Sequence, residues 1–169
     1  MQSLANLFKP YLPNDGEPAI YWSGLCGSAE GLAIAQTARD DTPPVIVVTR
    51  DNRRLQLHHN EIQFYRSGGN APPVARLPDW ECLPYDLFSP HQDITSERLR
   101  TLAKVPTMGH GLLLVTLETS MQRLPPKDHV LGQTFTLACG ETLDIEMFRN
   151  QLQQSGYFSV TQVMGPGEY

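Results

Sequence analysis

Short apolar runs separated by turn residues organise the first two thirds of the chain. They lie at residues 19–22, 45–49, 74–77 and 112–115, and each is predicted to be a β-strand. The run at 45–49 is β-branched throughout and does not alternate with polar residues. Such a continuous run predicts a parallel strand that is buried on both faces.

Segments with helical spacing alternate with these runs. Helices are predicted over residues 28–39, 51–65 and 96–105. Ser28 is placed to cap the first of them. The positions predicted to face the core in the second and third helices are Leu55, Ile62, Tyr65, Leu99 and Leu102. Strands that alternate with helices at this spacing predict an α/β fold with a doubly wound, mostly parallel sheet.

The pattern changes after the proline pair at 125–126. Residues 133–139 and 158–163 alternate as antiparallel strands do, and Asp144 can cap a helix that ends near Gly156. This change predicts two domains, a nucleotide-binding-type fold over 1–130 and part of a small α+β domain over 131–169. The second domain is expected to be incomplete.

Composition narrows the class of protein. Of the 169 residues, 40% are hydrophobic and 18% are charged, which is typical of a soluble globular chain. Neither an apolar run of membrane-spanning length nor a secretory signal pattern is visible, so a cytoplasmic location is expected and no membrane partner. Thirteen basic and eighteen acidic residues give a net charge of −5, which argues against a stand-alone nucleic-acid-binding domain.

Three cysteines, Cys26, Cys82 and Cys139, form no Cys-x-x-Cys pair. Neither a zinc site nor a disulfide framework is therefore indicated, and reduced thiols are expected. The sequence also has no His-x-x-x-His or Gly-x-Ser-x-Gly motif, so no catalytic residue and no metal ligand is predicted.

The turn after the run at 19–22 lies where an α/β nucleotide-binding fold would place a phosphate loop. That loop has the pattern G-x-x-x-x-G-K-S/T, in which lysine neutralises phosphate and the hydroxyl ligates magnesium. With Gly24 in register, Ala29 stands at the second glycine, Glu30 at the lysine and Gly31 at the hydroxyl. The acidic side chain would repel phosphate, at a cost of about 1–4 kcal/mol at partly screened separations.

This segment is therefore predicted to be a degenerate phosphate loop that does not bind or hydrolyse ATP. Its residues are Gly24, Gly27, Ser28, Ala29, Glu30 and Gly31. A coincidental glycine turn would give the same pattern. The rival interpretation is an active ATPase or helicase core that binds ATP through Gly24–Gly31.

The helix predicted over 51–65 has a mildly basic face, made by arginines at positions 50, 53, 54 and 66. Solvation and pairing with Asp51 and Glu61 account for such a face. Contact with a phosphate is the alternative that the sequence leaves open.

Residues 79–91 form an unusual stretch that is rich in proline and aromatic residues. Prolines stiffen a loop and can hold its aromatic side chains in fixed positions. Such side chains either pack against the sheet or present a recognition surface. Glu81 and Asp86 in this loop are expected to be solvated rather than catalytic.

The same stretch carries a family resemblance. Its residues Trp80, Glu81, Leu83, Pro84, Tyr85, Asp86, Ser89, Pro90, His91 and Arg98 resemble a signature of the bacterial transcription-repair coupling factors (Mfd). The segments 121–123, 156–157, 162–164 and 167–169 extend the likeness to nearly the whole chain after residue 20. The resemblance is to the N-terminal module of that family, which is similar to UvrB.

The resemblance implies a parent protein that is an ATP-dependent DNA translocase. Such a protein displaces stalled RNA polymerase at DNA lesions and recruits nucleotide excision repair through UvrA. ATP and Mg²⁺ would act in a motor further along the parent, on duplex DNA. The N-terminal module itself would be a non-catalytic adaptor without a cofactor, in agreement with the degenerate loop.

One departure from the family concerns UvrA. In the family an Arg-Gly segment follows the Gly-Glu-Tyr found here at 167–169. UvrA contacts are attributed to that segment and beyond, so no UvrA-contact residue is assigned in this chain. Binding of UvrA is expected to be weak or lost.

Overall fold

The computed structural model describes residues 10–14, 16–38, 43–66, 72–82, 86–87, 89–132, 134–135 and 137–169. It divides into two compact units, Met1–Asp79 with Thr107–Gln122, and Trp80–Pro106 with Arg123–Tyr169. Each unit is described by itself. The division into domains at residue 130 stays a prediction about the parent protein.

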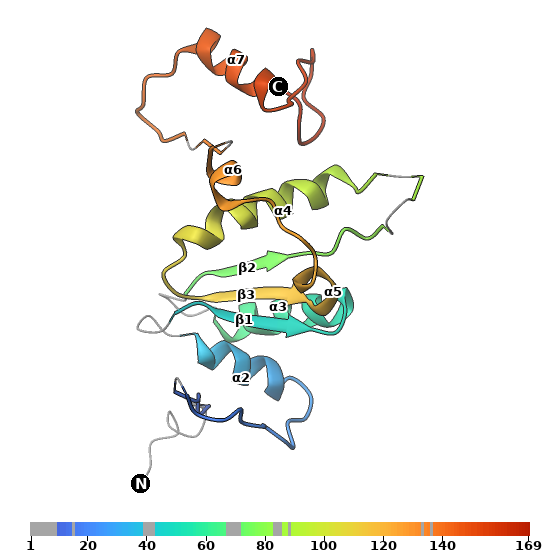
Figure 1. Cartoon of the computed structure of the whole chain (residues 1–169), viewed down its shortest axis with the longest axis vertical. Coiled ribbons are helices and arrows are strands. Elements are labelled where there is room, and N and C mark those ends of the chain that lie inside the picture. Colours follow the sequence, from blue (N-terminus) through green and yellow to red (C-terminus); the bar gives the residue numbers. More distant parts are fainter. Residues whose placement is uncertain are drawn as a thin grey trace. The chain divides into compact units, whose positions relative to one another are not determined.

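The first unit is built on a parallel sheet. Its strands are β1 (Val45–Thr49), β2 (Val74–Leu77) and β3 (Leu112–Thr116), in the order β1-β3-β2 (Figure 1). Leu112 at the start of β3 pairs in register with Val45 on one side and Val74 on the other. The predicted α/β fold with a mostly parallel sheet is confirmed, the described strands being all parallel, and all three strands lie where their apolar runs predict them.

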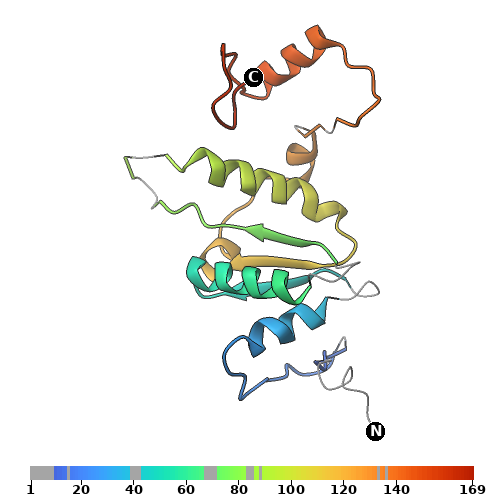
Figure 2. The same ribbon diagram turned by 180° about the vertical axis from the view of Figure 1, so that it is seen from behind.

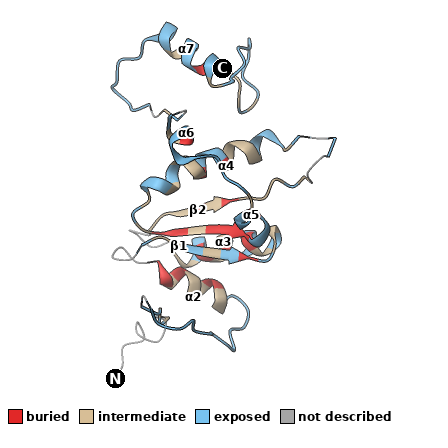
Figure 3. Cartoon of the chain, in the orientation of Figure 1, coloured by how far each residue is buried: buried red, intermediate tan, exposed pale blue. Residues whose placement is uncertain are grey.

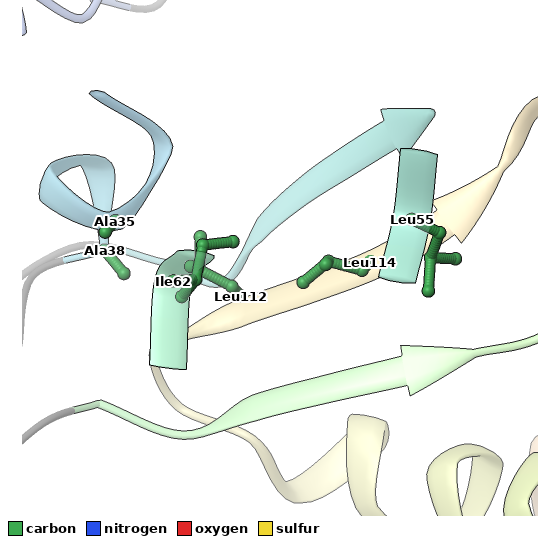
Figure 4. Packing of buried hydrophobic residues seen from close by; sticks show 6 residues of the cluster. All are labelled: Ala35, Ala38, Leu55, Ile62, Leu112 and Leu114. Carbon is green, nitrogen blue, oxygen red and sulfur yellow. The ribbon is translucent and has the colours of Figure 1, made fainter. Parts of the chain in front are cut away.

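Helices α2 (Ala29–Thr37) and α3 (Asn52–Tyr65) pack together, and α3 packs on one face of the sheet against β1 and β3 (Figure 2). A short helix, α5 (Leu117–Ser120), follows β3. The core is formed by small and branched side chains of α2, α3 and β3, which point toward one another in Figure 4. Its buried members are Ala35, Ala38, Leu55, Ile62, Leu112 and Leu114. The predicted inward positions Leu55 and Ile62 are confirmed.

Two predictions about the strands are wrong. Residues 19–22 form no strand, and Tyr21 is 92% exposed. One face of β1, an edge strand, is not buried, since its Ile46 and Val48 are exposed, whereas central β3 is mostly buried (Figure 3). Hydrogen-bonding partners and neighbouring layers make a segment a buried strand, and the composition of a short run does not specify them.

The second unit contains α4 (Gln92–Lys104), α6 (Lys127–Gly132) and α7 (Ile145–Gln154), and a 3-10 turn, η1 (Val105–Thr107), follows α4. Helix α7 is as predicted: the Asp144 carboxylate accepts from the backbone N–H of Met147 at 3.0 Å, and Gly156 follows the helix with φ +85°. Helix α4 begins four residues before position 96, because His91 caps it. Leu99, predicted to face inward, is 52% exposed.

The predicted antiparallel strands of this unit are wrong for the residues that the structure describes. Residues 134–135 and 137–139 contain no strand, and positions 133 and 136 lie outside the described part. In place of a strand at 158–163 there is an isolated bridge between Phe158 and Glu168. Among the described helices of both units, none combines the length and apolarity needed to cross a bilayer.

Candidate functional site: the degenerate phosphate loop

A glycine turn leads into α2. Gly24 and Gly27 have φ values of +74° and +59°, the left-handed region that glycine adopts without strain. Ser28 occupies the N-cap position as predicted, but its side chain makes no capping hydrogen bond. Its Oγ instead lies 2.6 Å from the hydroxyl of Tyr65 at the end of α3. The turn is therefore fixed against α3, and the described residues before it contain no strand.

Glu30, at the lysine position of the phosphate-loop pattern, lies in the first turn of α2. Its carboxylate forms an ion pair with Arg54 and lies 3.4 Å from Nε2 of His58. His58 Nδ1 is 3.1 Å from Oε2 of Glu61. We call these four residues of α2 and α3 the Glu30 cluster. The His58 side chain is only 3% exposed, so the cluster reaches from solvent into the interface of the two helices.

Gly31, at the hydroxyl position of the pattern, is buried against α3. A Cβ atom there would come within 2.3 Å of Oε2 and 2.6 Å of Cβ of Glu61, which is closer than real Cβ contacts come. The two helices can approach this closely only because residue 31 has no side chain. The lysine and hydroxyl positions are thus both used for packing α2 against α3.

This geometry does not suit a nucleotide phosphate. A phosphate loop requires a cation at the position that Glu30 occupies, and Arg54, the nearest guanidinium, is already paired with this carboxylate. Two unit negative charges about 4 Å apart near a protein surface repel by roughly 4 kcal/mol. Among the described residues, no group of three or more His, Cys, Asp or Glu side chains is placed to hold a metal ion.

The residues of α3 in the Glu30 cluster were not predicted as site residues. The sequence places Arg54 on a basic face that solvation, pairing with Asp51 and Glu61, or contact with a phosphate can explain, and it assigns no role to His58. Their signal was the spacing of positions 54, 58 and 61, which places them on one face of a helix. Sequence alone could not show that this face meets Glu30.

The loop at residues 80–91 of the second unit, which carries the family signature, is partly described. The guanidinium carbon of Arg98, a buried residue of α4, lies 4.1 Å from the centre of the Trp80 ring, in cation–π geometry. Glu81 has φ +56° and is exposed. His91 Nδ1 accepts from the backbone N–H of Asp93 at 3.3 Å and so caps α4. The arrangement anchors one end of the loop on α4.

The other signature residues of this loop differ in exposure, and some of them lie outside the described part. Asp86 and Ser89 are exposed and Pro90 is half-buried. Leu83, Pro84 and Tyr85 lie outside the described residues. The role of this loop, in packing or in recognition, stays a prediction.

Asp51, the N-cap of α3, makes the stability of the first unit depend on pH. The backbone N–H of Arg54 donates to its carboxylate at 2.8 Å, and Arg50 pairs with it at 3.0 Å. These contacts, the backbone N–H first, hold the pKa of Asp51 below its ordinary value of 3.8. A lowered carboxyl pKa stabilises the fold above the unfolded pKa, and this contribution is lost as pH falls through the folded pKa.

An Asp51→Asn variant should therefore lose the pH-dependent part of this stabilisation, because asparagine caps a helix without titrating. The check is the free energy of unfolding of both chains from about pH 7 down to about pH 2. The difference between them should shrink below pH 3.8 and vanish in strong acid. Two profiles that stay parallel throughout would contradict this role of Asp51.

No family model matches the chain. It is 40% identical to the transcription-repair-coupling factor of Escherichia coli K12 over 145 residues. The matched region covers 86% of this chain and 12% of that protein. The transcription-repair-coupling factor of Haemophilus influenzae is 34% identical over 165 residues, 96% of this chain and 14% of that protein. The chain thus spans a small part of the length of these relatives.

Proposed function

Because this chain belongs to the family of transcription-repair-coupling factors, we propose that it is a non-catalytic adaptor portion of such a protein. It corresponds to the UvrB-like N-terminal module. The parent would displace stalled RNA polymerase at lesions by moving along duplex DNA, with ATP and Mg²⁺ bound in a separate motor. In the cytoplasm, this portion would link that motor to UvrA and so to nucleotide excision repair.

One observation carries the non-catalytic assignment. Glu30 stands where a working phosphate loop has lysine, and its carboxylate is engaged by Arg54 and His58. A carboxylate that already holds two partners of its own chain is a structural residue of the α2–α3 contact. The buried Gly31 supports the same conclusion, because the position that should ligate magnesium has no hydroxyl.

Isothermal titration of the chain with MgATP tests this proposal. No saturable heat is expected at millimolar ATP, because the loop lacks both the cation and the magnesium ligand. A heat signal with micromolar affinity would contradict the proposal if it persists in an Arg53→Gln variant. That variant leaves the loop untouched and removes an exposed guanidinium of α3 that could bind phosphate elsewhere.

The partner is tested separately. UvrA is immobilised, and the chain is passed over it at rising concentration while binding is followed by interferometry. We expect a weak response or none from this chain, and a saturable response from the whole parent protein. No response from either this chain or the whole parent protein would overturn the UvrA assignment, whatever the outcome with ATP.

A further inference from the structure

A cavity of about 550 Å³ lies on α3, lined by Arg50, Arg53, Arg54, Gln56 and Leu57. Three of its five lining residues are arginines, all from a short stretch where β1 ends and α3 begins. Arg53, Gln56 and Leu57 are exposed, whereas Leu55 and Ile62 of the same helix are buried in the core. The cavity thus opens on the face of α3 that points away from the core.

The arginines differ in how far their charge is neutralised. Arg50 is 89% exposed and pairs with Asp51, and Arg54 pairs with Glu30. Arg53 forms no ion pair with any other described residue. Arg76 of β2 donates from Nη1 to Oε1 of Gln56, one of the lining residues, at 2.8 Å. The site therefore has a positive excess that its own carboxylates do not cancel.

The chemistry of these groups favours phosphate. Guanidinium forks match the geometry of phosphate oxygens and bind them with two parallel hydrogen bonds. The first turn of α3 adds the partial positive charge of a helix N-terminus. The charge of Asp51 opposes an anion, but it is already shared between the N–H of Arg54 and the side chain of Arg50. In open parallel sheets, ligands bind beyond the carboxyl ends of the strands, where Arg50 lies.

We infer that this arginine cavity, formed by Arg50, Arg53, Arg54, Gln56 and Leu57, binds the phosphodiester backbone of a nucleic acid strand. The apolar wall given by Leu57 suits a sugar ring beside the phosphate. An acidic protein segment is less suited, because it has no sugar ring to place against that apolar wall. The net charge of −5 limits the contact to a local one, so it should be weak and independent of base sequence.

Fluorescence anisotropy tests the inference with the intact chain at low salt. The probes are a labelled duplex DNA and a labelled single-stranded RNA of equal length, which share the phosphodiester and distinguish its source. Both should bind, or one of them, and an Arg53→Gln variant should weaken binding about fivefold or more. The affinity should also depend less steeply on salt in that variant: the negative slope of log affinity against log salt should become about one unit shallower.

The control is Arg100→Gln, which removes the same charge from an exposed position of α4 in the second unit. It should leave the affinity unchanged, and circular dichroism should show both variants folded. Equal losses in the two variants, or no binding of either probe, would overturn the inference. If a polyglutamate peptide binds as tightly and depends equally on Arg53, the cavity is instead a docking site for acidic protein.

Discussion

Replacing Gly111 with alanine is expected to lower the free energy of unfolding by roughly 3 kcal/mol or more, from backbone strain together with steric overlap. Gly111 has φ +122°, a conformation that side-chain-bearing residues rarely adopt. An added Cβ would come within 2.3 Å of the carbonyl oxygen of Pro73. That oxygen cannot turn aside, because it accepts the N–H of Leu112 at 2.9 Å.

The position of Gly111 explains why the effect should be large. Its own carbonyl accepts the N–H of Val45 at 2.9 Å, so both neighbours of the central strand β3 are joined there. Any shift that relieves the overlap pulls on β1 or β2. Urea unfolding followed by circular dichroism measures the loss.

Gly109→Ala is the matched control for Gly111. It adds the same methyl group two residues earlier, where nothing lies within 4 Å and φ is not positive. Its stability should stay close to that of the original chain. Equal losses from the two substitutions would show that the overlap with Pro73 is relieved without cost, against this interpretation.

Rebuilding the phosphate loop should destabilise the chain rather than create a nucleotide site. In a Glu30→Lys, Gly31→Thr double variant, lysine would stand beside Arg54 and His58, and the threonine Cβ would overlap Glu61. We expect a loss of about 3 kcal/mol, mostly from overpacking at residue 31, with no gain of ATP binding. The measurements are urea unfolding and titration with MgATP.

The single variants separate the two causes. Glu30→Gln keeps the size of the side chain and removes its charge, and because Glu30 is 42% exposed its effect should stay near 1 kcal/mol or below. Gly31→Ala gains about 1 kcal/mol of helix propensity but meets Glu61. It should still be a net loss. A double variant that is as stable as the original and binds MgATP would refute the assignment of both residues to helix packing.

Much of the fold could be predicted because its signals are local. The strands at 45–49 and 74–77 coincide with their apolar runs, and the carboxylate of Asp144 caps α7 where the sequence places it. A cap needs only a hydrogen bond to a backbone N–H three residues away. Such an interaction can be read from a few neighbouring positions.

The candidate site shows where local signals end. The sequence identifies Glu30 and Gly31 as departures from a phosphate loop, because the pattern fixes their register with Gly24. It does not identify their partners. Arg54 lies 24 residues further along the chain, and only the packing of α2 on α3 brings it to Glu30.

The sequence by itself thus determined the α/β class, the three strands of the sheet, the cap of α7 by Asp144 and the absence of a lysine from the loop. The tertiary structure decided that residues 19–22 form no strand, that one side of β1 is exposed, and that Glu30 and Gly31 serve the contact with α3. The physical reason is the range of the interactions. Backbone propensity and capping act over a few residues, whereas strand pairing, burial and ion pairing depend on groups distant in the chain.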